Sequence, residues 1–247
     1  MAGMTPERLK VVPLFNGLSV DQCAQLLDRH LETSHAADQV IVMQQDWGES
    51  LFLMRSGMAK VRTFTNDGEE VVMALLGEGD VFGEMAALEG TPRSADVVAL
   101  TSLTVLKLRA GPFSELLHRE ASFALALARL EAARLREMNR RLSLQWADAT
   151  IRLLDALAYL ARCSSPEGDP QAPIPALAQR EMGVLAGLAR ETASRTLSKL
   201  RQRGTVEQHN GLLRIVDLQP LIKRGLLSPP DRKGLVAGAV SDITAAT

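Results

Sequence analysis

The segment EMAALEGTPRSADV, residues 84–97, places a carboxylate and a guanidinium close together. Glu84 and Arg93 are nine residues apart. An arginine supplies a permanent positive charge and a rigid fork of donors that suits a phosphate. An ionised glutamate only accepts hydrogen bonds, so it suits a sugar hydroxyl. The pair therefore predicts a site for a small ligand with hydroxyls at one end and a negative charge at the other.

The neighbours of this pair fit the same chemistry. Ser94 offers a hydroxyl and a backbone N–H, and Gly83 lets a ligand approach the main chain. The stretch between Glu84 and Arg93 is long enough for a short helical turn whose N-terminal amides also face a phosphate. The residues alone leave one alternative open, in which Glu84 and Arg93 form a salt bridge that closes a loop.

Residues 189–200, ARETASRTLSKL, predict a helix with two different faces. One face packs inward through Ala193, Leu197 and Leu200. The polar residues of the other face lie near the helix N-terminus: Arg190, Glu191, Ser194 and Arg195. A helix that enters the major groove of DNA with its first turns needs this arrangement.

The polar face carries the chemistry for reading base pairs. Arginine donates two hydrogen bonds to guanine, glutamate accepts from cytosine N4, and serine bonds to several base edges. Lys199, Arg201 and Arg203 follow one turn later and suit phosphate contacts, which position a protein without specifying a sequence. The alternative for Glu191 and Arg195 is an ordinary surface pair at i,i+4 spacing.

The surrounding sequence predicts strands first and helices later. GLSVDQCAQLLDRHL, residues 17–31, predicts a helix that begins with a capping box from Ser19 and Gln22. Between 39 and 109, short Val-, Leu- and Thr-rich segments alternate with turn residues, and TNDGEE at 65–70 is a hairpin signal. Many short strands with frequent turns indicate an antiparallel barrel or sandwich.

Residues 120–162 contain no Pro or Gly and predict a long helix, with a break near 146–149. Its apolar residues share narrow faces: Phe123, Leu127 and Leu130, then Leu135, Met138 and Leu142. Such a stripe is typical of a seam between two subunits, because a helix this long outruns a small domain. The alternative is a helix packed on its own domain.

The C-terminal part begins after the Pro- and Ser-rich linker at 163–175. Two helical patterns then flank Gly187, and the sequence HNGLL at 209–213 follows within a short strand pair. This order predicts a helix-turn-helix with a wing. From Leu226 onward the periodicity fades, and we expect a flexible tail.

The distribution of charged residues along the chain indicates which partners each part can bind. The 247 residues are 46% hydrophobic, with a formal net charge of −1. Residues 1–118 hold nine Lys and Arg against sixteen Asp and Glu, whereas residues 171–224 hold nine against four. The first part repels polyanions, and the second attracts them.

The sequence lacks the signatures of several other classes of protein. Neither a membrane span nor a signal peptide is evident, and Cys23 and Cys163 suggest no disulfide, so we expect a cytoplasmic protein. The four histidines have no metal-site spacing: His30, His35, His118 and His209. No catalytic constellation can be argued, so we expect neither an enzyme nor a metal site.

The segment LAGLARETASRTLSKL, residues 185–200, resembles the DNA-reading element of the cyclic-AMP receptor protein and fumarate-nitrate-reduction regulator superfamily. The pattern R-E-x-x-[GS]-R matches Arg190, Glu191, Ser194 and Arg195. The resemblance implies a homodimer that binds double-stranded DNA at a palindrome with TGTGA-like half-sites and contacts RNA polymerase. For helix-turn-helix dimers, the half-site centres lie about 34–36 Å apart.

The segment VFGEMAALEGTPRSADV, residues 81–97, resembles the phosphate-binding cassette of cyclic-nucleotide-binding domains. The matching residues are Gly83, Glu84, Met85, Ala86, Pro92, Arg93, Ser94 and Ala95. One departure concerns the base, because Met138 and Asn139 stand where cyclic-AMP receptors carry hydroxyl residues. Asn139 can hydrogen-bond a base edge, whereas Met138 cannot donate. Cyclic AMP, cyclic GMP, a cyclic dinucleotide and an unresponsive pocket all remain open.

Together these observations predict an α+β chain of three working parts. A cyclic-nucleotide-binding antiparallel β-barrel of the jelly-roll type spans 1–118, a dimerisation helix 119–146, and a winged helix-turn-helix 147–225, before a tail at 226–247. We expect a transcription regulator controlled by a small-molecule effector. The alternatives are a constitutive regulator and a nucleotide sensor that acts through a protein partner.

Overall fold

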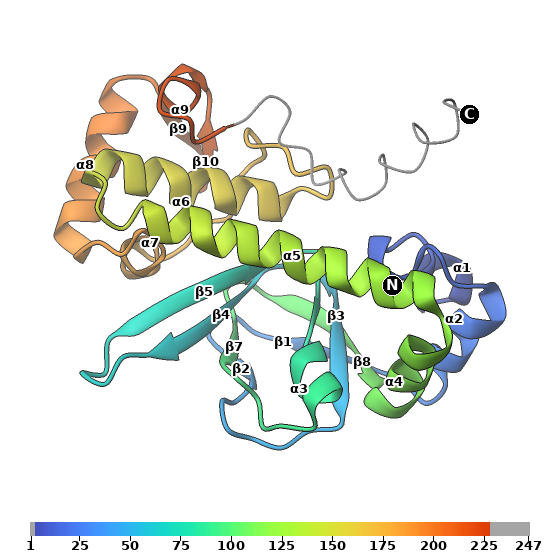
Figure 1. Cartoon of the computed structure of the whole chain (residues 1–247). Coiled ribbons are helices and arrows are strands. Elements are labelled where there is room, and N and C mark those ends of the chain that lie inside the picture. The colour runs from blue at the N-terminus through green and yellow to red at the C-terminus, as the bar shows by residue number, and fades with distance from the viewer. Residues whose placement is uncertain (1–2, 228–247) are drawn as a thin grey trace, which may run out of the picture.

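Two four-stranded antiparallel sheets form the N-terminal part of the computed structural model, which describes residues 3–227 (Figure 1). The first sheet has the order β1 (Leu31–His35), β8 (Leu103–Arg109), β3 (Ser50–Ser56), β6 (Val81–Phe82). The second has the order β2 (Val40–Val42), β7 (Asp96–Ala99), β4 (Ala59–Phe64), β5 (Glu70–Leu76). Eight antiparallel strands divided between two sheets in this order form a jelly roll.

The expected barrel is not closed. Every strand pair of the jelly roll lies within one sheet or the other, so within residues 3–227 no ladder of hydrogen bonds joins the two sheets at an edge. Side chains hold the sheets together instead, through a core that includes Phe52, Phe82 and Val97. Phe52 and Phe82 stack with their ring centroids 4.9 Å apart. The class α+β and the antiparallel sheets are confirmed.

Helices cover the outer face of the first sheet. They are α1 (Pro6–Leu9), the 3-10 turn η1 (Pro13–Phe15), α2 (Val20–Leu27), α4 (Ala110–Arg119) and the start of α5 (Ala121–Ser143). Phe15, Phe113 and Phe123 are buried among them. The capping box at the start of α2 is confirmed, since Ser19 Oγ accepts from Gln22 N and Gln22 Oε1 accepts from Ser19 N.

The long helical segment breaks where the sequence predicts. Helix α5 ends at Ser143, and α6 (Ala149–Ser164) begins after a short turn. Asp148 causes the restart, because its carboxylate accepts hydrogen bonds from Thr150 N at 2.8 Å and Ile151 N at 3.0 Å. In Figure 1, α5 runs from the N-terminal helices across the β-sheets to the C-terminal part.

The C-terminal part packs further helices and a two-stranded wing on α6. The elements are α7 (Gln179–Ala186), α8 (Arg190–Gln202), β9 (Val206–His209), β10 (Leu212–Ile215) and α9 (Gln219–Ile222). Gly187 has φ 59° between α7 and α8, a conformation that glycine adopts without strain. Leu226 and Leu227 are buried in the core of this part. The remainder of the expected tail, 228–247, lies outside the described residues.

The C-terminal part is seated directly on the β-sheet part. Met58, Val72, Leu75 and Leu100 belong to the same hydrophobic core as α6 and α7. Gly77, directly after β5, marks a close approach: a Cβ added there would lie 2.1 Å from the carbonyl oxygen of Cys163 in α6. The two parts therefore share an interface with no space for one more methyl group at this point.

We predict that Gly77→Ala destabilises the chain by about 1–3 kcal/mol, because the backbone at Cys163 has to move. Urea unfolding would measure the change. Gly111→Ala is the matched control, since no described atom outside its chain neighbours and its own helix backbone lies within 4 Å of the added Cβ. Equal unfolding free energies for the two variants would contradict the tight contact.

Candidate effector and DNA-binding sites

The predicted phosphate cassette forms a turn and a short helix, α3 (Glu84–Glu89). Gly83 precedes the helix with φ 84°, which is why a glycine stands there. A Cβ at Gly83 would also lie 2.6 Å from Arg93 Nη1, and one at Gly48 would lie 2.7 Å from Arg93 Nη2. Two glycines thus make room for one guanidinium, and they bring main chain close to it on both sides.

Arg93 is buried against neutral groups, with 6% of its surface exposed. Its Nη1 donates to the carbonyl of Gly83 at 2.9 Å and its Nη2 to that of Ser50 at 2.6 Å. The guanidinium carbon lies 5.8 Å from the ring centroid of Phe52. Burial lowers the pKa of Arg93, and the charge of Glu84 opposes this shift. The site therefore holds a desolvated cation that has hydrogen-bond acceptors but no direct counterion among residues 3–227.

Glu84 is buried at 4% exposure and pairs with Arg134 on α5, not with Arg93. The Nη1 of Arg134 lies 2.9 Å from Glu84 Oε1. The other carboxylate oxygen, Oε2, is buried without a hydrogen-bond partner in the described part of the chain. A Glu84–Arg93 bridge that closes the loop is therefore not the arrangement found, and Glu84 retains an unused acceptor beside the cassette.

Arg134 is the residue that the sequence reasoning missed. Besides Glu84, it pairs with Glu131 at 3.0 Å, and its Nη2 donates to the carbonyl of Val81. Burial raises the pKa of Glu131, and the nearby Arg134 opposes the shift. The sequence holds one signal for Arg134. It lies four residues before Met138 on the predicted long helix, and residues four apart share a helix face, so Arg134 lies on the same side as a predicted ligand residue. Arg134 joins α5 to the cassette.

The remaining predicted effector residues differ in exposure. Ala86 is buried and Met85 exposed on α3, and Met85 Sδ lies 3.9 Å from the hydroxyl of exposed Ser94. Met138 and Asn139 are exposed on α5. Within residues 3–227, neither of these two side chains has a hydrogen bond to the cassette. The structure thus assembles the sugar-phosphate end and leaves the base-end residues on an open helix face.

The predicted reading helix is α8. Arg190, Glu191, Arg195 and Lys199 are exposed on it and Ser194 is half-buried, while Ala193, Thr196 and Leu200 are buried beneath. In the described part of the chain, Glu191 and Arg195 form no ion pair, so the surface-pair alternative is not found. The polar side chains are available to an external partner.

Two shallow hollows flank Arg195. One of about 480 Å³ is lined by Gln179, Arg190, Glu191, Ser194 and Arg195. The other, of about 530 Å³, is lined by Asp148, Ala149, Thr150, Thr192, Arg195, Thr196, Lys199 and Arg224. The first hollow has two arginines against one glutamate, and the second has two arginines and a lysine against one aspartate, so cations outnumber carboxylates in both, as suits a polyanion.

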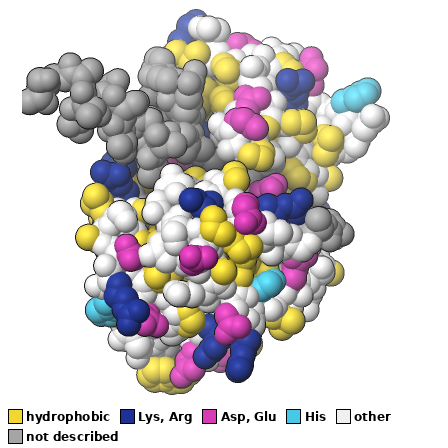
Figure 2. All heavy atoms as spheres, turned by 90° about the vertical axis from the view of Figure 1, so that its right-hand side faces the viewer, with side chains coloured by type: hydrophobic (Ala, Val, Ile, Leu, Met, Phe, Trp, Pro, Cys, Tyr) yellow, Lys and Arg dark blue, Asp and Glu magenta, His cyan; other side chains and the backbone are white. Residues whose placement is uncertain are grey.

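The face seen from the side of the N-terminal helices differs from this surface. Figure 2 shows Lys, Arg, Asp, Glu and hydrophobic side chains interspersed there, without a large patch of one sign.

Two regions of the chain match known families. Residues 32–120 match the cyclic nucleotide-binding domain, and residues 151–224 match the Crp-like helix-turn-helix domain. The Cyclic AMP receptor protein of Thermus thermophilus is 34% identical over 210 residues, which cover 84% of this chain and 94% of that protein. The chain belongs to the CRP/FNR family of transcription regulators.

Solved structures of two other proteins share the fold of this chain. FixK2 from Bradyrhizobium japonicum has a TM-score of 0.66 at 22% identity, with 78% of this chain and 96% of FixK2 covered. The c-di-GMP-responsive global regulator CLP of Xanthomonas campestris has a TM-score of 0.63 at 22% identity, with 81% and 100% covered. At these identities the likeness concerns the fold alone.

Membership in the CRP/FNR family decides the class of function. The chain is a DNA-binding transcription regulator with a cyclic-nucleotide-binding domain, and its domains are those of regulators rather than enzymes. Among residues 3–227, no helix is long and apolar enough to cross a membrane. The same residues contain no cluster of three or more His, Cys, Asp and Glu that could hold a metal ion.

We predict that Arg134→Met destabilises the chain by about 3 kcal/mol, because Glu84 would keep a buried charge without its cation. Adding Glu84→Gln to that variant should restore part of the loss, since the unpaired charge is then absent. Chemical denaturation of the three proteins would measure both effects. Arg136→Met, on an exposed part of α5, is the control. A loss for Arg136→Met as large as that for Arg134→Met would refute the role of the pair.

Proposed function

We propose that this chain is a homodimeric regulator whose affinity for a palindromic operator is controlled by a cyclic nucleotide, with cyclic AMP as the first candidate. The observation that carries the proposal is the buried Arg93 guanidinium, whose partners in residues 3–227 are carbonyls and an aromatic ring. A cation in such surroundings lacks the water that would stabilise its charge. A cyclic phosphate would supply the missing negative charge.

The proposed ligand contacts divide into two ends. Arg93, Ser94 and the amides of Met85 and Ala86 would bind the cyclic phosphate, with Gly83 leaving room for it. Glu84 Oε2, which is buried and unpaired within the described residues, would accept a hydrogen bond from the ribose 2′-hydroxyl. Binding would then satisfy one buried cation and one buried acceptor together.

The base of the effector would be read from α5. Asn139 offers both a donor and an acceptor to a base edge, and Met138 offers an apolar contact. A relative is named for cyclic AMP and a structural neighbour for its response to c-di-GMP. Cyclic AMP is our first candidate, and cyclic GMP and c-di-GMP belong in the same binding experiment.

A second copy of the chain would cover the apolar face of α5. Leu135, Met138 and Leu142 are exposed along this helix, and Trp146 just beyond it is 93% exposed. A row of large apolar residues on a 23-residue helix supports a two-stranded seam. Pairing there would bring the base-end residues of both subunits next to each other.

The DNA would be read by α8 of each subunit. Arg190, Glu191, Ser194 and Arg195 are proposed for base edges, and Lys199 for phosphate. The two helices of a dimer would enter major grooves about 34–36 Å apart. RNA polymerase is the proposed protein partner. We propose 1–118, 119–146 and 147–225 as the effector, dimerisation and DNA-binding units.

Operator binding with and without cyclic AMP tests the proposal at fixed salt concentration. We expect cyclic AMP to raise the affinity for a duplex with two TGTGA half-sites by about 5–150-fold. Arg93→Ala should remove nucleotide binding and keep weak non-specific DNA binding, whereas Arg195→Ala should do the reverse. If no cyclic nucleotide changes the affinity, the chain is a constitutive DNA binder. If both variants damage both activities equally, the two sites are wrongly assigned.

The oligomeric state tests the seam separately. Leu135→Glu would place a charge in the apolar stripe, so we expect a monomer by sedimentation at micromolar concentration, together with a loss of operator binding. Arg129→Glu is the matched control, because it introduces the same residue at an exposed α5 position about 120° around the helix from Leu135. This control should keep the wild-type state. A dimeric Leu135→Glu protein would exclude this seam.

A further inference from the structure

Lys60 is a deeply buried lysine at the junction of the two parts, with 3% of its side chain exposed. Its Nζ donates to Glu181 Oε2 at 2.5 Å and lies 2.6 Å from Glu70 Oε1, an ion pair without hydrogen-bond geometry. Glu70 is on β5 of the effector part, whereas Glu181 is on α7 of the helix-turn-helix. One desolvated cation is therefore shared between the two matched regions of the chain.

The charges continue from Glu70 toward the cassette. Glu70 Oε2 lies 3.6 Å from Arg62 Nη1, and Arg62 Nε donates to Asp96 Oδ2 at 3.2 Å. These three side chains are between 11% and 21% exposed, so water screens them weakly. The order Glu181, Lys60, Glu70, Arg62, Asp96 alternates in sign at every step.

The last member of the series is tied to the phosphate cassette. Asp96 is three residues after Arg93, and its Oδ1 accepts from the backbone N–H of Gln44 at 2.8 Å. The Gln44 side chain donates to the carbonyl of Ser94 at 3.1 Å. A main-chain hydrogen bond adds a further contact, because the carbonyl of Asp46 accepts from Arg93 N at 2.9 Å. A shift of Arg93 or Ser94 would therefore move the loop that holds Asp96.

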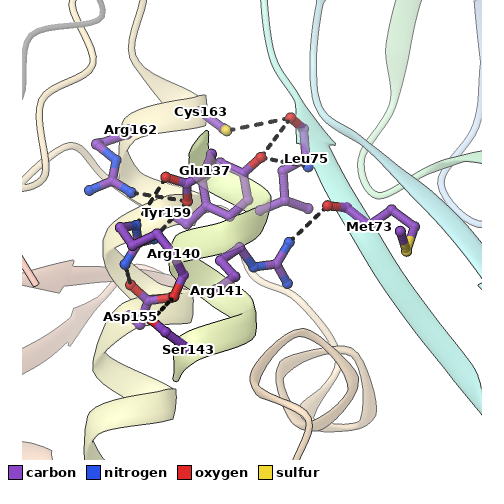
Figure 3. A network of polar contacts seen from close by, with 10 residues as sticks. All are labelled: Met73, Leu75, Glu137, Arg140, Arg141, Ser143, Asp155, Tyr159, Arg162 and Cys163. Carbon is purple, nitrogen blue, oxygen red and sulfur yellow. Dashed lines mark hydrogen bonds and ion pairs between the residues drawn. The ribbon is translucent and has the colours of Figure 1, made fainter. Parts of the chain in front are cut away.

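A second set of contacts fixes the same interface farther along β5 (Figure 3). Leu75 N donates to the Tyr159 hydroxyl at 3.0 Å, and burial raises the pKa of Tyr159. Arg141 donates to the carbonyl of Met73 at 3.2 Å. Both α6, through Tyr159, and α5, through Arg141, are therefore held on β5, whereas the charged series reaches the C-terminal part at α7.

The junction of α5 and α6 is cross-linked by its own ion pairs. In Figure 3, Arg140 on α5 reaches Asp155 on α6 and also Glu137. Arg140 lies 2.5 Å from Asp155 Oδ1. This second link joins the helix that carries Met138 and Asn139 to the DNA-binding part, and it shares no residue with the series from Asp96 to Glu181.

We propose that the ion-pair series Asp96–Arg62–Glu70–Lys60–Glu181 transmits the state of the nucleotide cassette to helix α7, by a route separate from α5. This inference rests on the proposed function, in which a nucleotide at the cassette controls DNA affinity. When the ligand repositions Arg93 and Ser94, Asp96 moves with them and Arg62 follows its carboxylate. Lys60 cannot release either glutamate without leaving a charge unpaired in the interior, so the shift reaches Glu181 and α7.

The test measures how strongly cyclic AMP changes operator affinity in Glu181→Gln, in Arg62→Met and in the double variant. Both substitutions lie outside the proposed ligand and DNA contacts. Glu167→Gln is the matched control, because it removes one carboxylate from an exposed linker position of the same part. Calorimetry with cyclic AMP and a thermal melt show whether each variant folds and binds nucleotide.

We expect each single variant to bind cyclic AMP within about threefold of wild type and to lose at least about fivefold of the affinity change that the nucleotide produces. The double variant should lose no more than the larger single loss, because members of one route are not additive. Glu167→Gln should respond as wild type does.

Three outcomes decide the inference. If folded variants that bind cyclic AMP keep the wild-type response, the ion-pair route is refuted while the proposed function stands. Additive losses would refute a single connected series. A wild-type protein whose operator affinity ignores cyclic AMP, cyclic GMP and c-di-GMP would refute the proposed function, and the inference with it.

Discussion

The need of buried cations for negative partners governs the arrangement of this protein. Arg134 meets that need through Glu84 and Glu131, which attaches α5 to the cassette. Lys60 meets it through one carboxylate from each part of the chain, which attaches the helix-turn-helix to β5. Arg93 has carbonyl acceptors but no carboxylate within ion-pair distance in the described residues. A buried cation without a counterion is costly. The cassette is thus the place where an incoming anion gains most.

The sequence predicted the features that depend on short-range patterns. The helix break near 146–149, the Ser19 capping box and the Gly187 turn each involve residues within four positions of one another, so local rules decide them. The order of strands, a helical pair and a wing followed from periodicity in the same way. Closure of the barrel was different. It depends on whether edge strands of two sheets pair, and no residue pattern in the sequence reports on that.

The candidate site was predictable only in part, for the same reason. Gly83, Glu84, Arg93 and Ser94 stand within one cassette, and their chemistry could be argued from spacing. Arg134 lies 50 positions from Glu84, and Glu181 lies 121 positions from Lys60. Ion pairs at such separations depend on how sheets and helices dock, which charge patterns alone do not determine. The roles of Arg134 and Lys60 are therefore visible only in three dimensions.

The shared interface also limits how an effector could act. Met58, Val72, Leu75 and Leu100 are buried in one core with α6 and α7. Exposing a large apolar side chain costs roughly 1.5–3 kcal/mol, so separating the parts would cost far more than the typical coupling of about 1–3 kcal/mol between two ligand sites. Nucleotide binding would therefore not release the helix-turn-helix from β5. It would shift that part while the contact is maintained. A series of alternating charges suits such a shift, because one ion pair can lengthen as the next shortens and each charge keeps a partner.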